Sequence, residues 1–167
     1  MNTTYTIREA TYADIATIHR LASAIWEPTY SPILTQEQIA YMFQIIYTTE
    51  ALQQQMEEGQ TFLLLYSDSE PLGFAAYSLK DGQEQVYKLN KIYLLPARQG
   101  EGLGKRLLEA VEERVAALGA LFLDLNVNRH NKAKAFYERC GYQVHQEEDI
   151  AIGPYWMNDY VMRKKLA

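Results

Sequence analysis

Three glycines at alternate positions, Gly100, Gly102 and Gly104, follow an apolar run that is stopped by Pro96. Proline cannot donate to a sheet ladder, so a strand is expected to end there. Apolar residues then recur every four positions from 103 to 115, which predicts a helix. Glycines let the backbone approach an anion closely, and the unpaired N–H groups of a first helical turn point toward it. A strand, a glycine turn and a helix N-terminus in this order predict a phosphate-binding site.

The spacing of the glycines decides which phosphate ligand the loop fits. A dinucleotide-binding turn requires G-x-G-x-x-G, but here the third glycine comes one residue too early. A P-loop requires four residues between its first glycine and a Gly-Lys pair that Ser or Thr follows. Gly100 and Gly104 enclose only three residues, and Lys105 is followed by Arg106. The sequence therefore fits neither nucleotide-binding pattern.

A third pattern, Q-x-x-G-x-G, is formed by Gln99, Gly102 and Gly104 directly after the predicted strand. It resembles the pyrophosphate loop of the GNAT superfamily of N-acetyltransferases, which hold the diphosphate of acetyl-CoA. The loop alone is also compatible with a glycine-rich turn that merely links a strand to a helix. A second, independent match is needed to separate these two interpretations.

The second match is the segment NKAKAFYERCGY at residues 131–142. GNAT enzymes commonly carry an asparagine, an alanine, a Phe-Tyr or Leu-Tyr pair and a closing Gly-Phe or Gly-Tyr in this region. At the matching spacing the chain has Ala133, Phe136, Tyr137, Gly141 and Tyr142. The asparagine departs from the pattern, because the family position holds His130 and Asn131 comes one residue late. Both segments, in the right order, indicate that the chain resembles a single GNAT acetyltransferase domain over residues 1–167.

The resemblance implies where acetyl-CoA would bind. In the family, the pantetheine arm lies in a wedge between two parallel strands, which correspond here to residues 85–95 and 121–127. Backbone groups of Ile92 and Leu94 would pair with the pantetheine amides, and the Leu94 N–H would stabilise the oxyanion. The pyrophosphate would lie on the amides from Gln99 to Lys105. The implied acetyl-CoA site comprises Ile92, Tyr93, Leu94, Gln99, Gly100, Glu101, Gly102, Leu103, Gly104, Lys105, Asn131 and Tyr137.

Tyr137 is the residue that the resemblance assigns to proton transfer, because GNAT enzymes often use this tyrosine to protonate the departing thiolate. The alternative is a tyrosine that is buried for packing. Many relatives also carry a glutamate that accepts the ammonium proton on the strand that corresponds to 85–95, but the matching positions hold Lys88 and Asn90. Lysine is cationic near neutral pH and asparagine does not titrate there, so neither is expected to be the base. The base stays unassigned, with three carboxylates that could act through water: Glu27, Glu84 and Asp124.

The implied reaction moves an acetyl group from acetyl-CoA to a primary amine of a small molecule, by direct attack in a ternary complex. The helical N-terminal third, with aromatic residues at 26–30 and 41–47, is similar to that of bacterial polyamine N-acetyltransferases. Glu27 and Tyr30 are expected to contact the substrate. Two alternatives stay open: acetylation of a protein or peptide amino group, and a non-catalytic acyl-CoA-binding sensor domain.

Composition narrows the class of partner. Asp plus Glu outnumber Lys plus Arg by 21 to 16, and this net charge of −5 argues against nucleic acid and agrees with a cationic substrate. No secretory signal is visible at the start, and no apolar run approaches the ~20 residues that span a bilayer. Cys140 is the only cysteine, so no internal disulfide forms, and the three histidines lack metal-like spacing. A cytoplasmic protein without a metal or membrane partner is expected, and a homodimer is left open.

The elements that must position these residues follow from periodicity and turn signals. Strands are expected at 4–8, 61–66, 72–79, 85–95, 121–127, 142–146 and 155–164, and helices at 14–26, 35–46, 49–57, 103–115 and 131–139. The segment 26–34 contains two prolines and is expected to be a loop that either lines a pocket or packs as a connection. Because the crossover between 85–95 and 121–127 makes those strands parallel, we expect an α/β (α+β) fold. Its mixed sheet would be mostly antiparallel, have about seven strands with a splayed parallel pair at the centre, and be flanked by helices.

Overall fold

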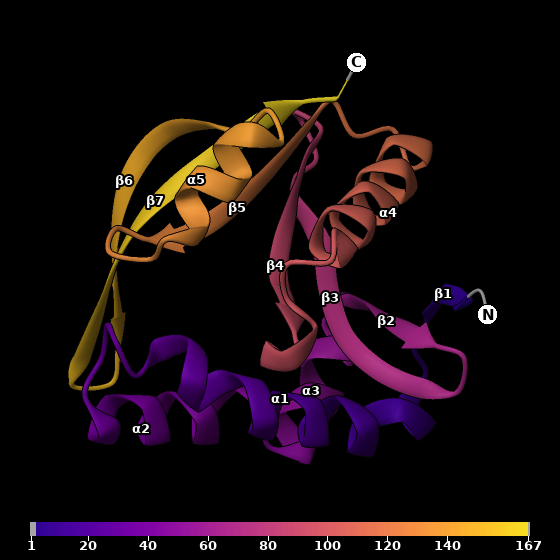
Figure 1. The fold of residues 1–167 in the computed structure, drawn as a ribbon. Helices are drawn as coiled ribbons and strands as arrows, with labels where there is room; N and C mark the ends of the chain where they lie inside the picture. The colour runs from indigo at the N-terminus through magenta and orange to yellow at the C-terminus, as the bar shows by residue number, and fades with distance from the viewer. Residues whose placement is uncertain (1–2, 167) are drawn as a thin grey trace.

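The computed structural model describes residues 3–166, which form a seven-stranded sheet with helices on both faces (Figure 1). The strands are β1 (Tyr5–Glu9), β2 (Thr61–Ser67), β3 (Glu70–Asp81), β4 (Val86–Leu94), β5 (Phe122–Asn128), β6 (Gln143–Ile152) and β7 (Tyr155–Lys165). Their order across the sheet is β1-β2-β3-β4-β5-β7-β6, and every neighbouring pair is antiparallel except β4–β5. The expected mixed sheet with a parallel central pair is confirmed.

The two faces of the sheet are covered by different helices. α1 (Ile15–Tyr30), α2 (Gln36–Ile46) and α3 (Thr49–Glu57) pack on one face, whereas α4 (Leu103–Ala117) and α5 (Ala133–Arg139) lie on the other. The run TFLLLY in β2 shows why both faces are apolar. Phe62 and Leu64 join the core under the N-terminal helices, whereas Leu63 and Leu65 join the core under α4. Successive side chains of a strand point to opposite faces, so a strand buried on both sides is continuously apolar.

The first helix is longer than the sequence indicates. We expected it to run out near Trp26, with a loop over 26–34, but α1 continues through Pro28 to Tyr30. Pro28 lies in the last turn, where it removes one N–H donor, and the Thr29 hydroxyl donates to the Ile25 carbonyl at 2.7 Å beside it. Trp26 and Tyr30 are both buried, so packing of this turn outweighs the cost of the proline.

The expected ranges of the second and third helices, 35–46 and 49–57, are confirmed to within one residue. Thr35 accepts from the Gln38 N–H and begins α2, and Thr48 accepts from the Ala51 N–H and begins α3. At the first cap the Thr11 N–H donates to Asp14 at 2.8 Å, as in a capping box, although the turn 12–14 is a 3-10 helix. β6 and β7 are the main difference at the other end of the chain. They form a hairpin longer than the predicted strands, because β6 is a mostly polar edge strand without a strong apolar pattern.

The central parallel pair diverges along its length. β4 pairs with β5 only over Val86–Leu89, which lie opposite Phe122–Leu125 of β5. On the other edge of β4, Tyr77 pairs with Leu89 and Ala76 pairs with Lys91, so Asn90 is an extra residue, a β-bulge. Beyond the bulge β4 stays on β3 while β5 stays on β7, and the two strands separate (Figure 1). None of the helices in residues 3–166 has the length and apolar character of a membrane span.

Candidate active site

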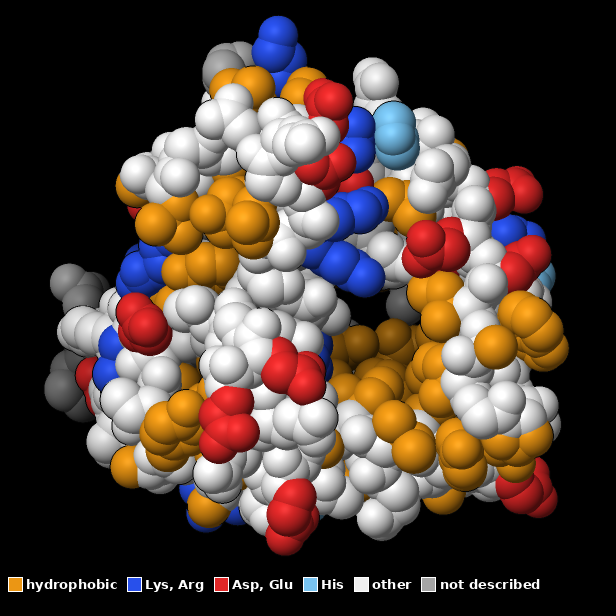
Figure 2. Space-filling view, turned by 180° about the vertical axis from the view of Figure 1, so that it is seen from behind, with side chains coloured by type: hydrophobic (Ala, Val, Ile, Leu, Met, Phe, Trp, Pro, Cys, Tyr) orange, Lys and Arg blue, Asp and Glu red, His pale blue; other side chains and the backbone are white. Residues whose placement is uncertain are grey.

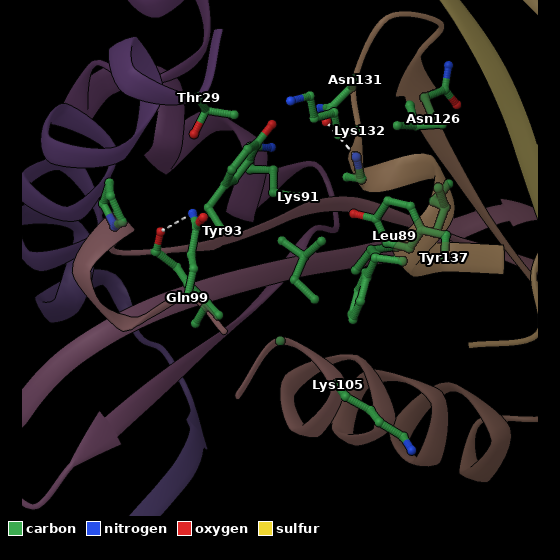
Figure 3. A pocket seen from close by; sticks show the side chains of 18 of the residues that line it. Thr29, Leu89, Lys91, Tyr93, Gln99, Lys105, Asn126, Asn131, Lys132 and Tyr137 are labelled. Atoms are coloured by element: carbon green, nitrogen blue, oxygen red, sulfur yellow. Dashed lines mark hydrogen bonds between the residues drawn. The ribbon is translucent and has the colours of Figure 1, made fainter. Parts of the chain in front are cut away.

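A cleft of about 790 Å³ occupies the gap where β4 and β5 diverge. It is lined by the end of α1, the second half of β4, the glycine loop, the start of α4, the end of β5, and α5 with the turn before it. Figure 3 shows residues from these separate segments pointing into one space. From the side opposite to Figure 1, the surface is hollowed near its centre, with a hydrophobic floor and Lys or Arg side chains on its upper edge (Figure 2).

The edge of β4 that faces this gap carries backbone groups to which no neighbouring strand of the described residues is paired. The Leu95 N–H donates to the Leu72 carbonyl at 2.9 Å, so the backbone groups of Leu95 face β3. Because these groups alternate along a strand, those of Leu94 and Ile92 face the gap. The Gln99 side-chain amide donates to the Leu94 carbonyl at 3.4 Å, which agrees with this direction. The two residues that the sequence assigned to the pantetheine arm thus lie on the cleft.

The glycine loop presents a run of unbonded amides. Gly100 and Gly102 have φ values of +86° and +78°, a region that L-residues other than glycine rarely occupy. The Gln99 N–H bonds to the Pro96 carbonyl at 3.4 Å, and the first bond of α4 runs from the Arg106 N–H to the Gly102 carbonyl. Between them, the amides from 100 to 105 have no acceptor among the described residues. Such a set of amides at a helix N-terminus suits a phosphate.

The residues of the loop differ in what each can offer to a bound phosphate. Gly104 lies on the cleft, where an added Cβ would stand 3.6 Å from both Leu94 and Phe136. Leu103 is buried in the core, so only its backbone is free to bind. The Glu101 carboxylate pairs with Arg98 at 2.9 Å, which neutralises the one acidic group of the loop. Lys105 is an exposed lysine that lines the cleft and lies 3.9 Å from Glu109.

Tyr137 projects its hydroxyl into the cleft from α5 (Figure 3). Its ring is buried against Phe136 and Tyr142, and its hydroxyl has no hydrogen-bond partner among the described residues. Burial raises the pKa of the Tyr137 phenol, with a smaller contribution from Cys140. Asn131 lines the same cleft, and its side-chain oxygen accepts from the Ala133 N–H at 2.9 Å at the start of α5.

The two residues expected to contact substrate are separated. Tyr30 lines the cleft, and its hydroxyl is 3.0 Å from that of Tyr93. Burial raises the pKa of both phenols, so both stay protonated. Glu27, one turn earlier on α1, is exposed and does not line the cleft; its carboxylate accepts from Gln36 at 3.3 Å.

The carboxylates considered as the base do not reach the cleft either. Asp124 is fully buried between Lys80 and Arg163, each at 2.7 Å. Burial alone would raise the pKa of Asp124, but the hydrogen bonds from Arg163 and Lys80 outweigh it and lower the pKa. Glu84 is exposed in the β3–β4 turn. No Asp, Glu or His among residues 3–166 lines the cleft, and no three such residues are placed to hold a metal ion.

Sequence reasoning missed Lys91, a buried lysine that lines the cleft. Regular alternation would place it on the same face as Leu89. The bulge at Asn90 turns it instead toward the N-terminal helices, where its ammonium lies over the Phe62 ring at 5.3 Å and donates to Gln60 at 2.8 Å. The only local signal is that Lys91 directly precedes the apolar end of β4, in a strand that also contains Lys88 and Asn90.

A loop of free amides beside an unpaired strand edge suits an extended ligand that bears both phosphate and amide groups, the chemistry of a coenzyme A thioester. The fold and the site therefore fit the class of α/β proteins that bind an acyl-CoA. The chain belongs to the GNAT acetyltransferase family, since the model of the acetyltransferase (GNAT) domain matches residues 30–164.

Relatives along most of the chain agree with this assignment. The chain is 27% identical to the spermidine N(1)-acetyltransferase of Thermoplasma acidophilum over 165 residues, which cover 95% of this chain and 96% of that protein. It is 32% identical to the aminoglycoside N(6')-acetyltransferase type 1 of Stenotrophomonas maltophilia over 148 residues, or 83% and 86% of the two chains. The PaiA N-acetyltransferase of T. acidophilum, solved with coenzyme A, superposes on this chain with a TM-score of 0.80 at 27% identity. The superposition covers 97% of this chain and 99% of that one. The protein is thus an acetyl-CoA-dependent N-acetyltransferase.

Proposed function

We propose that this protein transfers the acetyl group of acetyl-CoA to a primary amine of a small molecule, with polyamine-like amines as the leading candidates. The observation that carries the proposal is the cleft itself, which joins the free amides at 100–105 to a tyrosine-lined space beside Tyr30. Two relatives named for small amine substrates, spermidine and aminoglycosides, support the substrate class. The net charge of −5 favours a cationic acceptor.

In this proposal the backbone holds the thioester donor. The amides from 100 to 105 receive the diphosphate, and the free groups of Ile92 and Leu94 pair with the amides of the pantetheine arm. This pairing would extend the β4 edge as an added strand does. The Leu94 N–H then donates to the carbonyl oxygen as it gains negative charge during attack. Asn131 holds the start of α5 in place.

Tyr137 supplies the proton for the leaving group. Attack by the neutral amine forms the C–N bond, and collapse of the tetrahedral centre breaks the C–S bond and releases a thiolate. The Tyr137 hydroxyl donates its proton to that sulfur and regains one from the nitrogen of the new amide. Burial raises the pKa of Tyr137, so the phenol carries its proton throughout the physiological pH range.

The substrate class is tested by thiol release from acetyl-CoA with a panel of acceptors. The panel contains spermidine, putrescine, an aminoglycoside, and peptides with free N-termini or lysines. We expect the highest kcat/KM for a small amine that carries a second cationic group. A peptide that is acetylated faster than every small amine would overturn the substrate class proposed here, although the transferase assignment would stand.

The role of Tyr137 is tested by Tyr137→Phe. We expect kcat to fall by about 10²–10⁴-fold, the range of general acid catalysis, while the Kd for acetyl-CoA stays within about twofold. Stability should change little, because the hydroxyl bonds to no described residue. Tyr142→Phe is the matched control: Tyr142 is buried beside Tyr137 but donates to Glu112 at 2.7 Å and does not line the cleft. Its kcat should hold while its Tm falls. Normal turnover in Tyr137→Phe would show that another group protonates the sulfur.

A further inference from the structure

A second, smaller cavity of about 260 Å³ adjoins the cleft on the side of the N-terminal helices. It is lined by Trp26, Ile46, Tyr47, Gln55, Gln60, Asn90, Lys91 and Tyr93. Asn90, Lys91 and Tyr93 also line the cleft, so these three β4 residues form the boundary between the two spaces. An acceptor in the smaller cavity would approach the cleft at the bulge of β4.

One buried hydrogen-bond acceptor in the lining of this cavity lacks a donor within residues 3–166. The Gln55 side-chain nitrogen donates to the Ile46 carbonyl, whereas its oxygen is buried and has no donor among the described residues. Such an orphan acceptor costs free energy unless a ligand or water supplies a donor. Aromatic rings of Trp26, Tyr47 and Tyr93 complete the wall, and rings of this kind favour cations. An N–H-rich cation, such as an alkylammonium, matches this lining.

Of the three residues between the two cavities, Lys91 is the one whose side chain can accept a proton near neutral pH. Gln60, which directly precedes β2, and Phe62 of β2 contact its ammonium. The cavity wall adds Gln55 of α3 and the phenols of Tyr47 and Tyr93. None of the ion pairs among residues 3–166 involves Lys91, and no Asp, Glu or His lines either cavity. Burial, helped by the nearby charge of Lys88, lowers the pKa of Lys91 to about 7. A lysine with a pKa lowered this far carries an uncharged amine in a substantial fraction of the molecules at neutral pH.

We propose that Lys91 is the proton acceptor of the reaction and that the smaller cavity holds the acceptor's ammonium beside it. This inference rests on the proposed amine acetylation. The ammonium donates one N–H to the Gln55 oxygen and gives one proton to the Lys91 amine, directly or through one water. The amine that results attacks the thioester carbon. Lys91 then releases its proton to solvent, so the reaction overall yields the amide, the free thiol and one proton.

Lys91 thus acts as the general base, a role that Lys88 and Asn90 on the same strand were not expected to fill. A charged Lys91 would repel an ammonium at short range, so the cavity admits the acceptor when Lys91 is uncharged. The pH dependence has a definite sign. Activity is low below about pH 7, where Lys91 is protonated, and rises as Lys91 loses its proton.

The experiment compares pH profiles of kcat/KM for the wild type, Lys91→Met and Lys91→Arg, using the acceptor that the wild type acetylates fastest. The kcat/KM of the wild type should rise about tenfold per pH unit below about pH 7, the rising limb of the profile, and then level off. Both variants should lose this limb and fall by about 10²–10⁴-fold, because neither side chain accepts a proton near neutral pH. The Kd for acetyl-CoA should stay within about twofold in both. Lys165→Met, an exposed lysine at the end of β7, is the matched control and should leave the profile unchanged.

Lys88→Gln separates proton transfer from a structural role. Removing the Lys88 charge raises the pKa of Lys91, so the limb should move to higher pH without losing its amplitude. Wild-type turnover in Lys91→Arg would overturn the proposal, because a permanent cation would then suffice. A limb near pH 7 that persists in Lys91→Met would also overturn it. If the best acceptor is a peptide, the small-molecule proposal fails while this test of Lys91 still stands.

Discussion

Gly104→Ala separates the binding role of the glycine loop from its folding role. Gly104 lies in the first turn of α4, and its φ is outside the left-handed region, so alanine adopts the same backbone without strain. The new Cβ would stand 3.6 Å from the Leu94 side chain and 3.6 Å from the Phe136 ring, which is ordinary contact. The protein alone therefore has room for the methyl group.

The same methyl group would stand between Leu94 and Phe136, which both line the cleft, in the first turn that carries the free amides. Alanine in a helical turn should stabilise the fold by about 0.5 kcal/mol, or about 1–2 °C in Tm for a chain of this size. A diphosphate held away from the amides loses one charge-assisted hydrogen bond, about 1.5–3 kcal/mol. That loss corresponds to about a 10–150-fold weaker Kd for acetyl-CoA.

Calorimetric titration with coenzyme A and thermal denaturation measure the two effects on the same sample. Gly82→Ala is the matched control, because Gly82 lies in the β3–β4 turn and its added Cβ would meet only Leu79 at 3.7 Å. Its Kd should match the wild type. An unchanged Kd in Gly104→Ala would refute the placement of the diphosphate on this helix. A fall in Tm would refute the claim that the site tolerates the methyl group.

Two further changes test the backbone and the buried charge. Gly102→Ala should lower the free energy of unfolding by about 1 kcal/mol because φ is +78°, as measured by urea denaturation; unchanged stability would contradict the strain. Asp124→Asn should destabilise the protein by about 2–3 kcal/mol, because it leaves Lys80 and Arg163 without their shared carboxylate. The lowered pKa of Asp124 means that its contribution is complete above the unfolded value of 3.8 and is lost as pH falls through the folded pKa. Acid titrations of Tm should therefore be shallower in Asp124→Asn than in the wild type.

Much of the fold could be predicted because its signals are local. The helix starts near 35 and 49, the apolar strands and the crossover from β4 to β5 each depend on residues close in sequence, and the structure confirms them. The predicted end of α1 was wrong because Pro28 is a local stop signal, whereas the burial of Trp26 and Tyr30, which extends the helix, is a tertiary effect. Proline propensity yields to packing when the lost bond falls in the last turn.

The sequence by itself determined the glycine loop and the order strand, loop, helix, because backbone freedom and helix start depend on a few adjacent residues. Only the tertiary structure decided what surrounds Lys91. The bulge at Asn90 reverses the face on which its side chain lies, and the desolvation that lowers its pKa comes from β2 and α3, which the chain forms some 30 residues earlier. Burial is a property of neighbours distant in sequence, so no periodicity within β4 could have revealed it.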